Sequence, residues 1–66
     1  MKQYRLTIRR DGIRKYYMED GTFDNPKSKK TVKIFNRRID AMMAFLKLAR
    51  ARPADFADWY QDIEEV

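Results

Sequence analysis

The side chains of this chain with the clearest chemistry are three arginines and a tyrosine near its start. In YRLTIRRDGIRKYYM, residues 4–18, apolar and polar residues alternate on both sides of an Asp-Gly pair. The alternation predicts two strands, and Asp-Gly predicts a two-residue turn because a type I′ turn needs positive φ at both positions. That register sets Arg9 opposite Arg14 and puts Arg5 and Tyr16 on the same face.

Like charges directly across a strand pair destabilise it by a few tenths of a kcal/mol to about 1 kcal/mol, so an anion between Arg9 and Arg14 would relieve a cost. Guanidinium groups suit phosphates and guanine edges, and a twisted two-stranded ribbon fits the major groove of DNA. Double-stranded DNA is therefore the predicted partner. The alternative is that these cations only solvate the open side of a one-layer sheet and discourage edge pairing.

Further basic residues could extend this surface. A third strand over residues 31–35 is predicted by its β-branched and aromatic composition, with Val32 and Ile34 on the core face and Lys33 on the basic face. The segment 19–30 is rich in turn formers and predicts a loop. Its lysines either follow a phosphate backbone or are simply solvated: Lys27, Lys29 and Lys30.

Catalysis finds little support in the composition. The chain has no His and no Cys, which removes the most common general base and the best nucleophile. The acids of the C-terminal segment are typical of a solvated surface and do not make a metal site. We expect a non-enzymatic protein with no cofactor and no metal.

The charge is divided unevenly along the chain. Residues 1–52 hold all 15 basic residues and five of the ten acidic ones, a net charge of +10, whereas residues 53–66 hold five acids and no base, a net charge of −5. A basic body favours polyanionic partners, and an acidic end indicates a face with a different role.

The elements that must position these groups form one domain over residues 1–66, an α+β fold. A three-stranded antiparallel sheet within residues 4–35 is covered by a helix over residues 37–51, which Asn36 would cap. That helix is apolar over more than one stripe, so it needs burial on two sides.

The second cover is predicted to be a short amphipathic helix over residues 53–64, with Pro53 in its first turn. Its aromatic stripe is Phe56, Trp59, Tyr60 and Ile63 at i, i+3, i+4 and i+7. Three interpretations stay open for this stripe: part of the core, a docking surface for a protein partner, or a homodimer contact.

A family resemblance rests on the first strand and its Asp-Gly turn, on KTVKIF at residues 30–35, and on Asp40-Ala41 and Ala44-Phe45-Leu46. Over residues 4–51 the chain resembles the amino-terminal arm-binding domain of phage-type tyrosine integrases, which shares its architecture with the DNA-binding domain of plant ethylene-response factors. The resemblance implies three strands on one helix, with the strand face away from the helix in the major groove. The loop over residues 19–30 is longer than in that family.

We therefore expect a non-enzymatic double-stranded DNA-binding protein, such as a small phage-type regulator, that acts through the basic sheet face. The alternative is a small inhibitor or adaptor that docks on a larger enzyme through its basic face or its C-terminal helix. No apolar run reaches the roughly 18 residues of a membrane span, and the N-terminus lacks a signal-peptide pattern, so the expected location is the cytoplasm.

Overall fold

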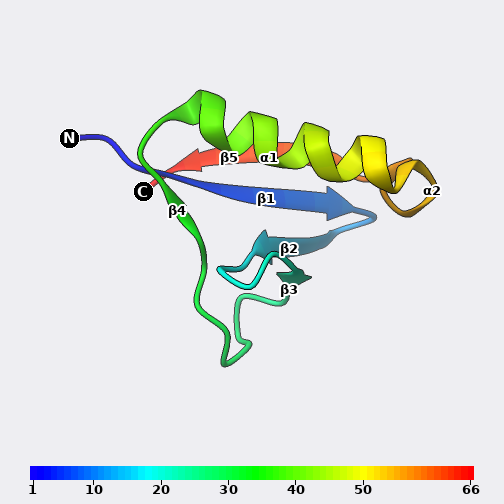
Figure 1. Ribbon diagram of the computed structural model, residues 1–66. Coiled ribbons are helices and arrows are strands. Elements are labelled where there is room, and N and C mark those ends of the chain that lie inside the picture. The colour runs from blue at the N-terminus through cyan, green and yellow to red at the C-terminus, as the bar shows by residue number, and fades with distance from the viewer.

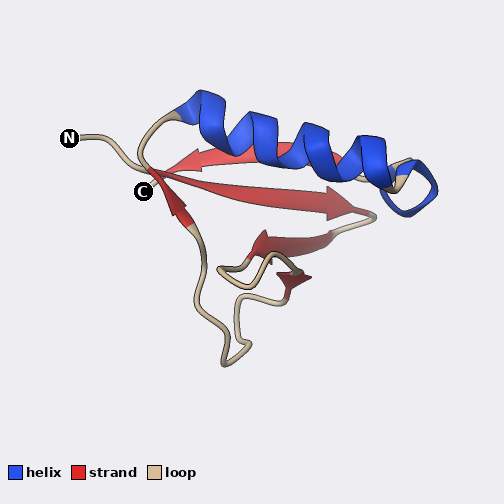
Figure 2. Cartoon of the chain, in the orientation of Figure 1, coloured by secondary structure: helices blue, strands red, loops and turns tan.

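An antiparallel sheet is covered on one face by a long helix (Figures 1 and 2). The structure is a computed structural model that describes residues 1–66. In chain order the elements are β1 (Tyr4–Arg10), β2 (Ile13–Tyr17), β3 (Phe23–Asp24), β4 (Ile34–Phe35), α1 (Arg38–Ala51), α2 (Pro53–Phe56) and β5 (Tyr60–Glu65). The predicted α+β class is confirmed, but the sheet has five strands instead of three.

β1 is the central strand of the sheet. One of its edges pairs with β5 along six residues, and the other pairs with β4 near the start of β1 and with β2 near its end. The predicted hairpin register is confirmed from Arg10 opposite Ile13 to Thr7 opposite Tyr16. Asp11 and Gly12 have φ values of 50° and 80°, which are the two positive φ angles that the turn requires.

The chain between β2 and α1 is less regular than the sequence indicated. The predicted loop contains β3, which pairs with the end of β2, and the predicted third strand is reduced to β4 and a single bridge between Met18 and Val32. Ile34 lies opposite Arg5 and is 39% exposed, whereas Phe35 packs against the core. The prediction that Ile34 faces the core is wrong, because the bulkier Phe35 takes that side.

α1 lies across β1 and β5 and also contacts β4 (Figure 1). It begins one residue later than predicted, and the cap position is Arg37, whose backbone is extended. Arg37 donates from its guanidinium to Asp40, at 2.9 and 3.0 Å, and no side chain accepts a hydrogen bond from the first N–H groups of the helix at the cap. The prediction that Asn36 caps the helix is therefore wrong.

The prediction of a C-terminal helix over residues 53–64 is also wrong beyond the first helical turn. Only Pro53–Phe56 is helical, and Tyr60–Glu65 forms β5. The physical reason is the second edge of β1, whose row of backbone N–H and C=O groups can be paired by another strand but not by a helix. Pairing along six residues outweighs the weak helical preference of this short segment.

The core lies between α1 and the sheet. Its buried members are Leu6, Ile8, Ala41 and Phe45. Aromatic rings surround them at partly buried positions, and Phe56 of α2 packs edge-on against Phe45, with ring centroids 5.9 Å apart. Neither helix is long and apolar enough to cross a lipid bilayer.

Candidate nucleic-acid interface

The sheet face that points away from α1 carries an ion-pair cluster across three strands. Arg5 of β1 donates from Nε and Nη2 to Oε2 of Glu64 on β5, at 3.1 and 2.7 Å. Arg14 of β2 donates from Nη1 to the other Glu64 oxygen and, at 3.3 Å, to Asp62. Two of the three predicted DNA-binding arginines on the ribbon are thus held by carboxylates of the same chain.

Thr7 shows how closely this cluster covers the sheet. To reach β5 from β2, the Arg14 side chain crosses β1 at Thr7, which is completely buried although it lies on the face without a helix. The Thr7 hydroxyl donates to the backbone carbonyl of Asp62 at 2.8 Å. Tyr16 is also engaged, because the Arg5 guanidinium lies 4.9 Å from its ring centroid.

The charges in the cluster stabilise each other. Hydrogen bonds from Arg5, together with the positive charges of Arg5 and Arg14, hold the pKa of Glu64 below its ordinary value of 4.5, although partial burial acts in the opposite direction. The hydrogen bond to Glu64 raises the pKa of Arg5 in turn. These shifts favour the charged forms of Arg5 and Glu64, and the ion pairs of the cluster join β2, β1 and β5.

At the hairpin end of the same face there is an open hollow. Arginines with and without an acidic partner line it. The hollow has a volume of about 460 Å³ and is lined by Arg9, Arg10, Asp11, Gly12, Arg14 and Tyr60. Arg9 lies opposite Tyr60 in the β1–β5 pair and has no acidic partner, and the Tyr60 side chain is 71% exposed. A free guanidinium beside an exposed aromatic ring suits a phosphate and a sugar or base.

The charged groups of Arg10 and Lys15 lie over Trp59, on the other side of the hairpin, although Arg10 also borders the hollow. The Arg10 guanidinium lies 4.5 Å from the ring centroid of Trp59, and the Lys15 ammonium lies 5.5 Å from it. Both cations retain their charge without a carboxylate partner, because an aromatic ring attracts a cation only through its quadrupole. They contribute positive potential at the end of the molecule where Arg9 lies.

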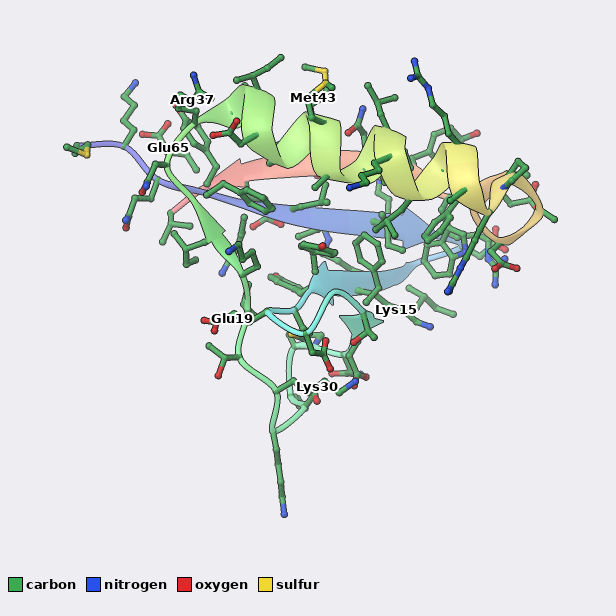
Figure 3. The ribbon with its side chains drawn as sticks, viewed as in Figure 1. Lys15, Glu19, Lys30, Arg37, Met43 and Glu65 are labelled. Atoms are coloured by element: carbon green, nitrogen blue, oxygen red, sulfur yellow. The ribbon has the colours of Figure 1, made fainter.

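The predicted loop lysines differ from one another. Lys30 lies 3.3 and 3.6 Å from Asp20 and Asp24, so its charge is compensated (Figure 3). Lys27 and Lys29 have no such partner. The prediction that Lys33 lies on the basic face is wrong. Its ammonium is 6.0 Å from the ring centroid of Phe35, on the core side of the sheet.

The four predicted docking residues do not share one surface, because the segment from Tyr60 onward is the strand β5 and not a helix. Phe56, Trp59 and Ile63 pack against the core, and Tyr60 alone is largely exposed. These residues do not form one stripe, because helical spacing does not apply to β5, where successive side chains alternate between faces. The core interpretation is confirmed for three of them.

Ion pairs engage a larger share of the acidic side chains than of the basic ones. Only five of the 15 basic side chains lie within 4.0 Å of a carboxylate oxygen, namely Lys2, Arg5, Arg14, Lys30 and Arg37. They engage six of the ten acids, which leaves ten cations and four anions without an ionic partner. The exposed surface is thus more one-sided in charge than the composition of the chain.

Sequence reasoning missed Asp62 and Glu64 as partners of the ribbon. The signal was present, since two acids spaced i, i+2 share one strand face and match the alternating arginines of β1 and β2.

No group of three or more carboxylates is arranged to hold a metal ion. No known protein family, curated protein or solved structure matches this chain.

Proposed function

We propose that this protein binds double-stranded DNA without catalysis, and that the hairpin end of the sheet makes the contact. The observation that carries the proposal is the hollow beside Arg9 and Tyr60, at an end of the molecule where Arg9, Arg10 and Lys15 lack an ionic partner. We infer the role of a small phage-type regulator from the sequence resemblance of residues 4–51 to the arm-binding domain of phage-type tyrosine integrases.

This proposal moves the contact away from the middle of the sheet. Arg5 and Arg14 would have to leave Glu64 and Asp62 before they could bind phosphate, and each departure would leave a carboxylate facing the DNA. Arg9 can bind a phosphate without breaking any ion pair. Lys27 and Lys29, on the loop before β4, provide further phosphate contacts for a duplex that lies along this side.

The test is fluorescence anisotropy with a labelled random duplex at several salt concentrations. The test variant combines Arg9→Ala with Tyr60→Ala, and the matched control combines Lys33→Ala with Val66→Ala. Each removes one cation and one exposed large side chain, but the control pair lies at the other end of β1 from the hairpin turn. Losing one phosphate contact should weaken binding across sequences and reduce the salt slope by about 1.

We expect the test variant to lose about tenfold in affinity at low salt, while the control variant stays within about twofold of wild type. Equal losses in both variants would mean that the net charge of +5, not the hairpin end, attracts DNA. Absence of binding by wild type at low salt would remove the DNA proposal.

Docking on a larger enzyme, the alternative function, loses one of its two proposed surfaces. The predicted C-terminal helix ends at Phe56, and only Tyr60 of the aromatic stripe is largely exposed. The basic face remains available to an acidic protein. In a competition assay, a polyglutamate peptide and an unlabelled duplex of equal charge would each displace the labelled duplex. Equal displacement by the two would favour this function.

A further inference from the structure

β5 is an edge strand with an unpaired side. Val66 N–H donates to Gln3 O at 2.8 Å, which fixes the alternation of hydrogen bonds between β5 and β1. In an antiparallel pair every second residue directs its N–H and C=O to the partner strand, and the residues between direct theirs outward. The backbone groups of Gln61, Ile63 and Glu65 therefore point away from β1, to the open edge.

One contact shows which side of α1 overlooks that edge. Arg38 donates from Nη2 to the outward carbonyl of Ile63 at 3.5 Å, a long and weak hydrogen bond. Met42 and Leu46 follow Arg38 at intervals of four residues, so all three lie on the same side of the helix. Each successive side chain is rotated slightly further away from the sheet.

This side of α1 is apolar and only partly covered. Met42 and Leu46 are half-buried, and Ile39 and Met43 next to them are 47% and 55% exposed. Figure 3 shows Met43 pointing away from the sheet. The prediction that α1 needs burial on two sides is thus half fulfilled, because the sheet covers one side and nothing in the chain covers the other.

We propose that a second copy of this chain covers both features at once, in a twofold symmetric dimer. The two β5 strands would pair antiparallel with Ile63 beside the twofold axis, and every outward backbone group of Gln61, Ile63 and Glu65 would find a partner. The Ile63 carbonyl would exchange its weak bond to Arg38 for a backbone N–H. The two α1 helices would then lie side by side over one continuous sheet. The proposal does not depend on DNA binding.

The spacing of the elements supports a second copy as the occupant. α1 packs against both β1 and β5, so its axis lies between two strands that are about 4.8 Å apart. A twofold axis half a strand spacing outside β5 lies about 5 Å from the helix axis. The two helices would be about 10 Å apart, which agrees with the 8–10 Å of packed helices. The two helices would run antiparallel, with Met42 and Leu46 on the side of each helix that faces the other.

The ion-pair cluster removes the main electrostatic obstacle to this pairing. With Ile63 on the axis, Asp62 of one copy lies opposite Glu64 of the other, and like charges in this position are destabilising. Both carboxylates already accept hydrogen bonds from arginines of their own chain, Arg5 and Arg14. The charge that would repel the second copy is compensated before the copies meet.

The size of the contact indicates a weak dimer. Six residues of β5 and about five of α1 are fewer than the roughly 20–30 residues per side of a standard interface, and suggest a total buried area on the order of 700 Å². We expect a dissociation constant on the order of 100 µM. Sedimentation velocity from about 10 µM to about 1 mM spans this range.

Two variants test the interface from its two elements. Gln61→Pro removes an outward N–H and leaves the bonds to β1 intact, since proline is tolerated where an edge strand faces outward. Ile39→Glu places a charge on the apolar side of α1. The control Ala51→Glu adds the same charge at an exposed position of the same helix, nine residues and therefore about half a turn from Met42. Circular dichroism verifies the fold of each variant.

We expect each test variant to raise the dissociation constant at least about tenfold and the control to change it less than about threefold. Wild type that stays monomeric at about 1 mM would overturn the proposal. So would a dimer that survives Ile39→Glu, because this variant alters an exposed residue and should fold even if Gln61→Pro does not. Equal weakening by Ala51→Glu would also overturn it.

Discussion

Glu64→Gln tests whether the ion-pair cluster holds the sheet together. The substitution keeps the shape of the side chain but removes the charge that lies between Arg5 and Arg14. A glutamine retains one acceptor oxygen, so one arginine can still donate to it and the other cannot. Glu65→Gln is the matched control, because it removes the same charge from the next residue, which lies 3.9 Å from an exposed Lys2.

The expected loss follows from burial and from the number of hydrogen bonds. The Glu64 side chain is 25% exposed, and both arginines are 36% exposed, whereas Lys2 and Glu65 are 73% and 54% exposed. Hydrogen bonds to charged groups contribute about 1.5–3 kcal/mol when they are removed, and exposed pairs about 0.2–1 kcal/mol. With partial solvent screening, we expect Glu64→Gln to cost about 1.5 kcal/mol and Glu65→Gln less than about 0.5 kcal/mol.

Urea unfolding followed by circular dichroism at 25 °C measures both losses. In about 1 M NaCl the loss from Glu64→Gln should shrink, because salt screens partly exposed pairs. Because the folded-state pKa of Glu64 is depressed, its contribution is complete at neutral pH and is lost as the pH falls through the folded value, below 4.5. Wild type and Glu64→Gln should therefore converge in acid. Equal losses for the two substitutions at pH 7 would refute the reasoning.

Two further substitutions test the turn and the core. Gly12→Ala should cost about 1 kcal/mol of unfolding free energy, because φ is +80° there and an added Cβ would meet no neighbour, so that the cost is conformational. Gly12→Asn should recover most of it, and a loss from Asn as large as that from Ala would contradict this account. Phe56→Ala should cost about 2–3 kcal/mol in the same urea assay, since its ring packs on Phe23 and Phe45 but is only partly buried. A loss below 0.5 kcal/mol would mean that α2 does not contribute to the core.

Local rules were sufficient for the hairpin and for α1. An Asp-Gly turn fixes the register of two alternating strands by itself, so Arg9 opposite Arg14 followed from adjacent residues. A long segment without a breaker, rich in Ala, Leu and Met, likewise predicts a helix wherever it lies. These elements depend on neighbours in sequence, which is why sequence alone could predict them.

β5 could not be predicted in this way, because it exists only through a partner far along the chain. Tyr60–Glu65 holds one aliphatic residue, and its pattern fits a short amphipathic helix as well as a strand. What decides between them is the unpaired edge of β1, more than 50 residues earlier, and the match of Asp62 and Glu64 to Arg14 and Arg5. Because the strand was not predicted, the carboxylate partners of Arg5 and Arg14 were not predicted either.

The proposed dimer and the proposed DNA contact can be related by geometry. Ile63, beside the twofold axis, lies opposite Leu6, and the hairpin turn is about five residues further along β1, or about 17 Å at 3.4 Å per residue. The two turns would be about 35 Å apart, which is the 34–36 Å between successive major-groove segments on one side of DNA. Both Arg9 hollows could then contact one duplex.

This geometry requires a duplex long enough for two contacts. A duplex of about 20 base pairs should bind wild type more tightly, per protein, than one of about 10 base pairs. Gln61→Pro should lose this advantage of length while it retains the affinity for the short duplex. The same length advantage in Gln61→Pro and in wild type would show that the two hairpin ends act separately, even if each of them binds DNA.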